Sequence, residues 1–161
     1  MGNVTQNKNE STELLQLVSF KIGSEEFGVD ILNVQEINKI TQITKVPNSP
    51  VFVEGVINLR GRVIPVIDLR ARLNLEKKEH DKDTRIIVVE IDNRTMGFIV
   101  DAVHEVLRIP VSITEAPPEI VTGIDSDFIK SVGKLDDRLL ILIDLNKILM
   151  KEETMQLQET V

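Results

Sequence analysis

The sequence predicts a mainly β protein in which two similar small β-barrels pack together. Short runs rich in valine and isoleucine recur along the 161 residues, and turn-forming residues separate them. An internal repeat relates the two halves: Gly28 falls on Gly97 at an offset of 69, and Ile67-Asp68-Leu69 falls on Ile143-Asp144-Leu145 at an offset of 76. Because one half alone would bury only a marginal core, we expect the two halves to pack against each other.

The first half begins with strands. Residues 1–13 are polar and are predicted to form a disordered N-terminal tail. Residues 14–22 and 26–29 are predicted to be two strands joined by a turn. Asp30 favours a short helical turn after them, and a strand with a β-bulge is the alternative. Residues 40–46 alternate weakly between apolar and polar and predict a further strand.

A hairpin lies at the centre of the first half. Residues 53–57 and 63–67 are the predicted strands, and the turn between them runs from Asn58 to Gly61. Asparagine suits the start of a turn and glycine accepts a positive φ, so both ends of this turn have the expected residue type. Pro65 lacks an N–H and therefore indicates an edge position, or one where the backbone N–H faces away from the ladder.

A capped helix and a charged connector follow. Asp68 is expected to cap a short helix over residues 69–75. Residues 76–83 are highly charged and are the predicted boundary between a first lobe, about 14–80, and a second lobe, about 81–152.

The second half is predicted to repeat this plan. Its expected strands cover residues 85–91, 95–100, 103–109, 128–132 and 139–143. Asp144 is expected to cap a closing helix over residues 145–150, and residues 153–161 form a frayed C-terminal tail. A longer loop between Pro117 and Asp127 accounts for the growth of the repeat offset.

Composition excludes several classes of function. The net charge of −7 argues against binding to nucleic acid through phosphate contacts. The absence of cysteine excludes disulfides and thiolate metal sites. The absence of cysteine also fits a reducing cytoplasm. The N-terminal stretch shows neither a basic nor an apolar region of a secretory signal, and no apolar run reaches the roughly 20 residues of a membrane span.

Catalytic motifs are also missing from the sequence. The two histidines, His80 and His104, share no spacing with each other or with a plausible nucleophile. His104 lies beside Glu105, but neighbours on a strand point to opposite faces, so a solvated histidine is the favoured interpretation. We therefore predict a protein that is not an enzyme and that uses neither a metal nor a cofactor.

The repeat separates architectural positions from candidate functional ones. Arg60, in the central turn, falls on Asp136 at the offset of 76, so the charge is reversed at equivalent points. If both turns only closed hairpins, either charge would serve. Arg60 is therefore a candidate contact residue, and a weakly paired, exposed turn residue is the alternative.

Four segments together resemble one family. Over about residues 14–151 the chain is similar to the CheW family of bacterial chemotaxis coupling proteins, on the segments FGVDILNVQEI, GVINLRGRVIPVIDLR, GFIVDAVHEVL and DRLLILIDL. The resemblance implies two SH3-like, five-stranded β-barrels around a shared core, with short helices. It also implies a non-enzymatic cytoplasmic adaptor that couples the cytoplasmic tips of chemoreceptors to the regulatory domain of the histidine kinase CheA. Such an adaptor supports assembly of the signalling array and is recruited to membrane-anchored receptor clusters.

The resemblance also implies a receptor-binding surface in the groove between the lobes. Matched to this sequence, that surface comprises Ile31, Val34, Glu36, Gly55, Asn58, Arg60, Arg85 and Ile86. An apolar strip with polar residues at its rim suits the binding of a helical receptor tip. From periodicity alone, Ile31, Val34 and Ile86 are core residues instead. The family's kinase contacts lie at turns at the ends of both barrels and are not assigned to residues here.

Two other functions stay open at this point. One is a CheW-like scaffold of another motility or signalling pathway. The other is a small ligand-binding β-barrel, against which the aromatic content of 3% and the acidic charge both count.

Overall fold

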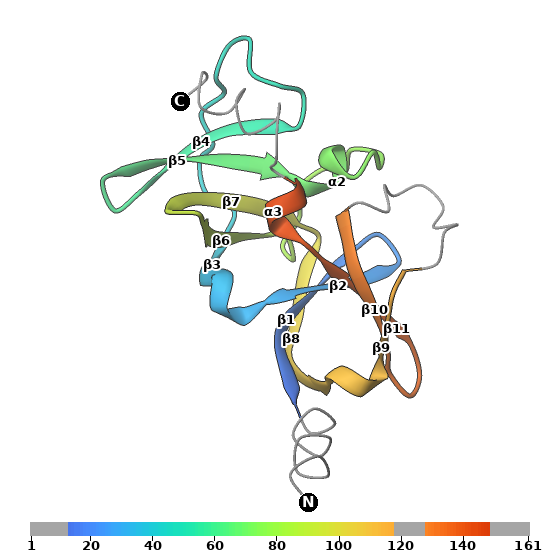
Figure 1. Ribbon diagram of the computed structural model, residues 1–161. Helices are drawn as coiled ribbons and strands as arrows, with labels where there is room; N and C mark the ends of the chain where they lie inside the picture. The colour runs from blue at the N-terminus through green and yellow to red at the C-terminus, as the bar shows by residue number, and fades with distance from the viewer. Residues whose placement is uncertain (1–12, 118–127, 149–161) are drawn as a thin grey trace, which may run out of the picture.

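The computed structural model describes residues 13–117 and 128–148. The predicted tails, apart from Glu13, lie outside these residues, as do most of the loop between Pro117 and Asp127 and the last two residues of the predicted closing helix. Within the described residues the fold is mainly β, as predicted (Figure 1).

Eleven strands and four short helices make up the described chain. The strands are β1 (Leu14–Ile22), β2 (Glu25–Asp30), β3 (Val34–Lys39), β4 (Val53–Leu59), β5 (Arg62–Asp68), β6 (Arg85–Ile91), β7 (Arg94–Val100), β8 (Ala102–Pro110), β9 (Thr114–Glu115), β10 (Ile129–Lys134) and β11 (Leu139–Ile143). The helices are η1 (Ile31–Asn33), α2 (Leu69–Arg72), η2 (Val111–Ile113) and α3 (Leu145–Ile148).

The strands form two sheets. One has five strands in the order β3-β6-β7-β5-β4, and the other has six in the order β8-β1-β2-β11-β10-β9 (Figure 1). The sixth strand of the larger sheet, β9, is only two residues long and was not predicted. Without it, each sheet has five strands, which is the number predicted for each lobe.

The sequence repeat is present in the backbone. Repeat one comprises β1 to β5 with α2, and repeat two comprises β6 to β11 with α3. The N–H of Asp68 donates to the carbonyl of Phe52 at 2.8 Å, and the N–H of Asp144 donates to the carbonyl of Phe128 at 2.9 Å. Both bonds join residues that the offset of 76 equates, so the two halves fold alike down to single hydrogen bonds.

Each sheet nevertheless contains strands of both repeats. The five-stranded sheet pairs β6 and β7 of repeat two with β3 and β5 of repeat one. The six-stranded sheet pairs β1 and β2 of repeat one with β8 and β11 of repeat two. The predicted lobe boundary near residue 80 therefore does not coincide with a boundary between the sheets.

The core has one large part and two small ones. The large cluster contains residues from both sheets and includes Phe20 and Phe27, whose rings stack at 5.9 Å, and Phe98. A smaller cluster of Ile and Val fills the five-stranded sheet, and one around Leu140 and Leu142 fills the six-stranded sheet. Burial of aliphatic side chains thus joins the two sheets into one body.

The region after β2 realises both alternatives that the sequence left open. The Asp30 carboxylate accepts a hydrogen bond from the N–H of Leu32 at 2.9 Å and caps η1. A β-bulge follows between Val34 and Glu36. The prediction of a strand over residues 40–46 is wrong. The strand in this region is β3, which ends at Lys39, and within residues 40–46 only Thr44 forms a β-bridge, to Val56. Its weak alternation reflects Ile40 and Ile43, which pack onto the small core of the five-stranded sheet.

The central hairpin has a tighter turn than predicted. Its strands continue to Leu59 and from Arg62, which leaves Arg60 and Gly61 as the loop, with φ of 50° and 84°. Two consecutive positive φ values give a type I′ turn, whose twist matches that of the flanking strands. The Asn58 side-chain oxygen accepts the N–H of Gly61 at 2.8 Å and fixes the turn.

The remaining local predictions concern Pro65 and α2. Pro65 pairs with Val56 of β4 and directly precedes the stretch in which β5 also pairs with β7, so its missing N–H interrupts no ladder there. Asp68 caps α2 as predicted, through a 3.0 Å bond from the N–H of Arg70, although the helix is shorter than expected.

Candidate functional site

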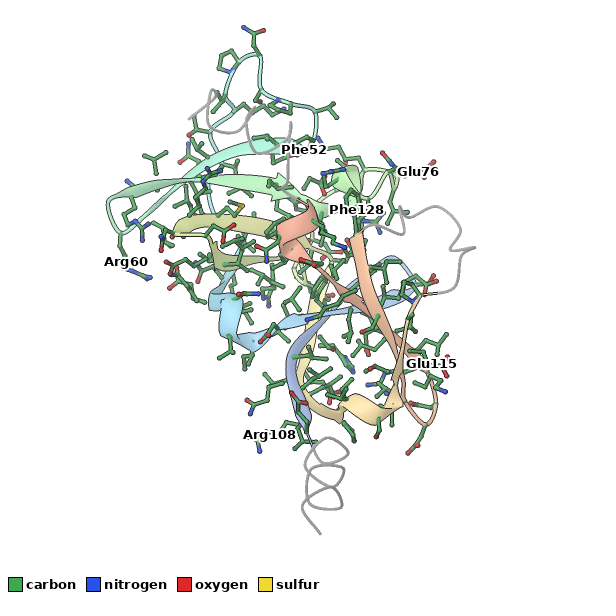
Figure 2. All side chains as sticks on the ribbon, in the orientation of Figure 1. Phe52, Arg60, Glu76, Arg108, Glu115 and Phe128 are labelled. Carbon is green, nitrogen blue, oxygen red and sulfur yellow. The ribbon has the colours of Figure 1, made fainter. Side chains whose placement is uncertain are left out.

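The tip of the β4–β5 hairpin presents Arg60 to solvent (Figure 2). Its side chain is 74% exposed and forms an ion pair with Glu36 of β3. Glu36 also accepts a hydrogen bond from the amide of Asn38 at 2.9 Å. The hydrogen bond from Arg60, followed by that from Asn38, lowers the pKa of Glu36, so the carboxylate is charged at neutral pH.

The Arg60–Glu36 ion pair joins the two edges of the five-stranded sheet. β3 is the first strand of that sheet and β4 is the last. A second link lies nearby in sequence, where the backbones of Thr44 and Val56 exchange hydrogen bonds of 2.9 and 2.8 Å. The sheet therefore closes on itself, and Arg60 is carried on a hairpin that is anchored from two directions.

Gly55 supports this closure from inside. A Cβ atom at this position would lie 2.3 Å from the carbonyl oxygen of Thr44 and 2.8 Å from a methyl group of Ile43. Gly55 is buried, so its role is to let the segment after β3 cross β4 at close range. This corrects the expectation that it belongs to a contact surface.

Ile86 is also a correction. It is fully buried in the small core of the five-stranded sheet, so its side chain is not part of any surface. Arg85, directly before it, is half-buried and donates to the carbonyls of Lys82 and Thr84 at 2.8 and 2.9 Å. Register places Arg85 opposite Lys39, at the end of β3 away from Glu36.

The apolar residues around η1 divide between core and surface. Ile31 and Val34 are half-buried and pack against the large core. Leu32, which lies between them, is 88% exposed, and Ile37 and Val63 are also exposed. Sequence reasoning missed these three. Strand alternation in β5 was the available signal for Val63, because its neighbour Ile64 faces the core.

The predicted site residues therefore form one local group and several supports. Glu36, Asn58 and Arg60 gather at the hairpin tip, while Ile31 lies in η1 and Val34 at the start of β3. Gly55 and Ile86 are buried in the five-stranded sheet that carries this group. Arg85 lies opposite Lys39, at the C-terminal end of β3.

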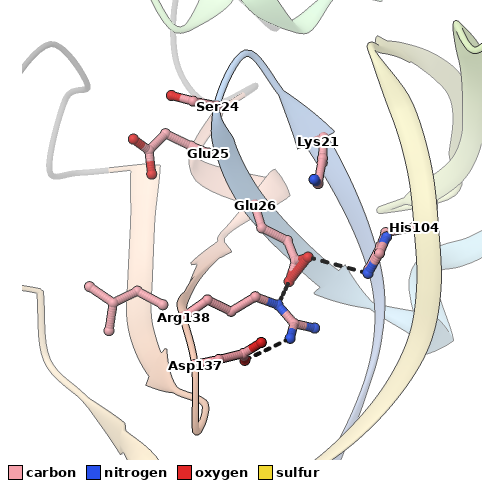
Figure 3. Close-up of a pocket in the computed structure, with 8 residues that line it drawn as sticks. Lys21, Ser24, Glu25, Glu26, His104, Asp137 and Arg138 are labelled. Carbon is pink, nitrogen blue, oxygen red and sulfur yellow. Dashed lines mark hydrogen bonds and ion pairs between the residues drawn. The ribbon is translucent and has the colours of Figure 1, made fainter.

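A second polar feature is an open pocket of about 490 Å³ at the end of the six-stranded sheet (Figure 3). At its centre, Glu26 is 6% exposed and accepts from the guanidinium of Arg138 at 2.9 Å. His104 lies 3.8 Å from Glu26 and 3.0 Å from Glu105.

The contact between His104 and Glu105 overturns the expectation that these neighbours point to opposite faces. A β-bulge causes it: β1 pairs Ser19 with Glu105 and Phe20 with Val103, so His104 is the extra residue. Among residues 13–117 and 128–148, no group of three or more His, Cys, Asp or Glu side chains is arranged to hold a metal ion.

The helices of the described chain are short. None of those within residues 13–117 and 128–148 is long and apolar enough to cross a membrane.

Comparison with known proteins matches this geometry to one family. The model of the CheW-like domain matches residues 16–153. The chemotaxis protein CheW of Klebsiella aerogenes is 38% identical over 86% of this chain and 83% of its own length, and that of Thermotoga maritima is 40% identical over 83% and 87%. The crystal structure of the scaffolding protein TtCheW from Thermoanaerobacter tengcongensis superimposes with a TM-score of 0.81 and 43% identity, over 88% of this chain and 96% of that one. The chain therefore belongs to the CheW-like domain family.

Proposed function

We propose that this protein is a non-enzymatic adaptor of bacterial chemotaxis, which couples chemoreceptors to the histidine kinase CheA and supports assembly of the signalling array. Family membership over nearly the whole described chain supports this role, as do the chemotaxis proteins and the scaffolding protein to which the chain is similar. The adaptor works in the cytoplasm and is recruited to receptor clusters at the membrane.

The observation that carries the proposal is the mounting of Arg60. A long cationic side chain is 74% exposed, yet its backbone lies in a tight turn tied to β3 and to the segment after it. A rigid mount lowers the entropy lost when the side chain engages a partner. Arginine on such a mount is a typical hot-spot residue of a protein interface.

Residues 31–36, which lead to the Glu36 that pairs with Arg60, fit a helical partner. Exposed Leu32 and half-buried Ile31 and Val34 offer apolar contact, and Glu36 with Asn58 adds polar contacts. A helix bound across these residues would present apolar side chains three and four residues apart, which suits the cytoplasmic tip of a receptor.

The Arg60–Glu36 pair also indicates how a receptor would bind. Guanidinium carries five N–H donors in a fixed fork, and the ion pair with Glu36 engages one terminal nitrogen of Arg60. The other donors are open to a carboxylate or carbonyl of the partner while Glu36 holds the fork in place.

Calorimetric titration against a receptor-tip fragment and, separately, against the CheA regulatory domain tests the proposal. We expect binding to both. Arg60→Glu should abolish receptor binding, because it places a carboxylate beside Glu36, while thermal unfolding stays nearly unchanged at this exposed turn. Asp136→Lys, at the repeat-equivalent turn, is the matched control and should leave receptor binding intact.

Two outcomes would contradict the proposal. If neither folded cognate partner binds the protein, the ligand-binding β-barrel becomes the better hypothesis. Unfolding of Arg60→Glu would mean that Arg60 serves the fold rather than the interface.

A further inference from the structure

The four strand pairings that link the hairpins all join different repeats. These pairings are β1 with β8, β3 with β6, β5 with β7, and β2 with β11. Among residues 13–117 and 128–148, the pairings within a repeat are those of the hairpins, the short β9–β10 pair and the Thr44–Val56 bridge. Among the described strands, neither repeat can therefore complete a sheet alone.

We propose that the two repeats are separable binding partners: residues 13–75 and 84–148 hold together without the covalent connector, and each can pair with the complementary half of a second copy of this chain. The physical basis is that pairing between strands of different repeats holds both sheets together, and the covalent link between the repeats is not needed for this pairing.

The parallel pairings show how specific this association is. Gly97 of repeat two pairs with Val66 of repeat one, and Gly28 of repeat one pairs with Leu142 of repeat two. Across the junction, a Cβ atom at Gly28 would lie 3.1 Å from Leu142 and one at Gly97 would lie 3.6 Å from Val66. The repeat offset equates the two glycines, so a glycine faces the strand of the other repeat at both junctions.

A second junction lies between α2 and α3. The guanidinium of Arg72 lies 4.3 Å from the ring centre of Phe128 in repeat two and 5.4 Å from that of Phe52 in repeat one. Arg72 also donates to the carbonyl of Ile148 at 3.0 Å. The two phenylalanines are repeat equivalents, as are Arg72 and Ile148, so this contact joins the halves where their equivalent helices meet.

The large core gives the association its driving force. Its buried side chains come from both repeats, including Phe20 and Phe27 from one and Phe98 from the other. Separation of the halves would expose these large apolar side chains to water, which opposes separation.

The connector contributes little to this association. Residues 76–83 are all exposed. They form hydrogen bonds and ion pairs with one another, with the adjoining ends of the two repeats, and with Glu54, which lies 3.5 Å from Lys77. Residues 78–80 also line a small pocket beside Ile99 and Asp101. A complementary half from a second copy presents the same strands and the same core, so it fits equally well.

The test uses the full chain with a protease site inserted between Glu79 and His80 and cut after folding. We expect native mass spectrometry to show a 1:1 pair of halves, with the far-ultraviolet circular dichroism of the uncut chain. When labelled and unlabelled cut protein are mixed, unfolded in urea and refolded by dilution, about half of the pairs should contain one half of each origin, because equivalent halves combine at random. The uncut chain, refolded in the same way, is the control.

Three results would overturn the proposal. If the two halves separate and each half keeps its circular dichroism spectrum, they are independent lobes. Cut protein that loses its structure would show that the connector is required, and intact pairs without mixed origin would exclude pairing with a second copy. Neither receptor nor kinase enters the experiment, so it fails or succeeds independently of the proposed function.

Discussion

The β4–β5 and β10–β11 hairpins are equivalent in the repeat, but their tips carry opposite charges. The first tip presents Arg60, which forms an ion pair with Glu36 on the opposite edge of its sheet. The second presents Asp136 and Asp137, and the side chain of Asp137 accepts from Arg138 at 2.9 Å. The same backbone plan is thus used to display a cation at one end of the molecule and carboxylates at the other.

The polar pairs next to the tips differ in the same way. In the first hairpin, Arg62 donates to the hydroxyl of Thr95 at 3.0 Å. At the equivalent place in the second, Arg138 donates to the buried carboxylate of Glu26 at 2.9 Å. Burial of a charge requires a charged partner, whereas a hydroxyl does not. The comparison teaches that the repeat preserves backbone geometry while charges diverge, which is how one fold acquires two different surfaces.

The largest effect is expected at Gly55, whose repeat equivalent is Ser131. Both lie at a β-bulge. At Gly55 another backbone crosses the strand, and a Cβ atom there would lie 2.3 Å from the carbonyl oxygen of Thr44. Gly55→Ser should lower the free energy of unfolding by about 3 kcal/mol or more. Ser131→Gly should change it far less. Urea unfolding of both variants measures the difference, and equal losses would mean that the two bulges are equivalent after all.

The second prediction compares Gly97 with Gly28 at the two parallel junctions. Gly97→Ala places a methyl group 2.7 Å from Ile86, and Gly28→Ala places one 3.1 Å from Leu142. Overpacking of this kind costs about 1–3 kcal/mol, and the shorter contact should cost more. Denaturant midpoints of the two variants measure this. A larger loss for Gly28→Ala would contradict the predicted order.

The third prediction concerns Asp101, whose repeat equivalent is the exposed Leu32. Asp101 accepts from Arg70 at 2.6 and 2.8 Å and from the N–H of Gly23 at 2.7 Å. Burial raises the pKa of Asp101, but the hydrogen bonds from Arg70 and Gly23 outweigh burial and lower the pKa below its ordinary value of 3.8.

A carboxyl whose pKa is lower in the folded state stabilises the fold above its ordinary pKa, and that stabilisation is lost as the pH falls through the folded value. Asp101→Asn should therefore be less stable than the parent at pH 7 and should lose less stability on acidification below about pH 4. Thermal unfolding from pH 2 to 7 measures both effects. Leu32→Asn is the matched control, and a parallel pH dependence in Asp101→Asn and the parent would disprove the assignment.

The last prediction compares the arginines next to the two tips. Arg138→Ala should lower the unfolding temperature more than Arg62→Ala, because it leaves the Glu26 carboxylate buried without its guanidinium partner. In the double variant Glu26→Gln with Arg138→Ala, most of this loss should be recovered. Calorimetric melting of the three variants tests this, and an equal loss from Arg62→Ala would remove the distinction between the hairpins.

Local features were predictable from the sequence because they depend on few neighbours. The caps at Asp30 and Asp68, the hairpin strands and the repeat itself follow from residue type and spacing. The exchange of strands between the repeats was not predictable. The two repeats have similar apolar strands, so a strand could pair equally well with a strand of its own repeat or of the other repeat. The burial of Ile86 agrees with the periodicity, which favoured a core residue, and differs from the contact role that the resemblance implied.

The site was predictable only in part for a related reason. The charge difference between Arg60 and Asp136 selected Arg60 as a candidate, but the ion-pair partner of Arg60 lies 24 residues away on another strand. The bulge at His104 depends on the register of β1 against β8, which no local pattern encodes.

The turn at position 60 has an evolutionary consequence. Arg60 adopts φ of 50°, a left-handed conformation that costs a residue with a Cβ atom about 1 kcal/mol and costs glycine almost nothing. Arg60→Gly would therefore relax the backbone and at the same time delete the exposed guanidinium. Selection for a more stable turn and selection for a binding side chain act in opposite directions here, so the persistence of arginine in a lineage would record which pressure prevailed.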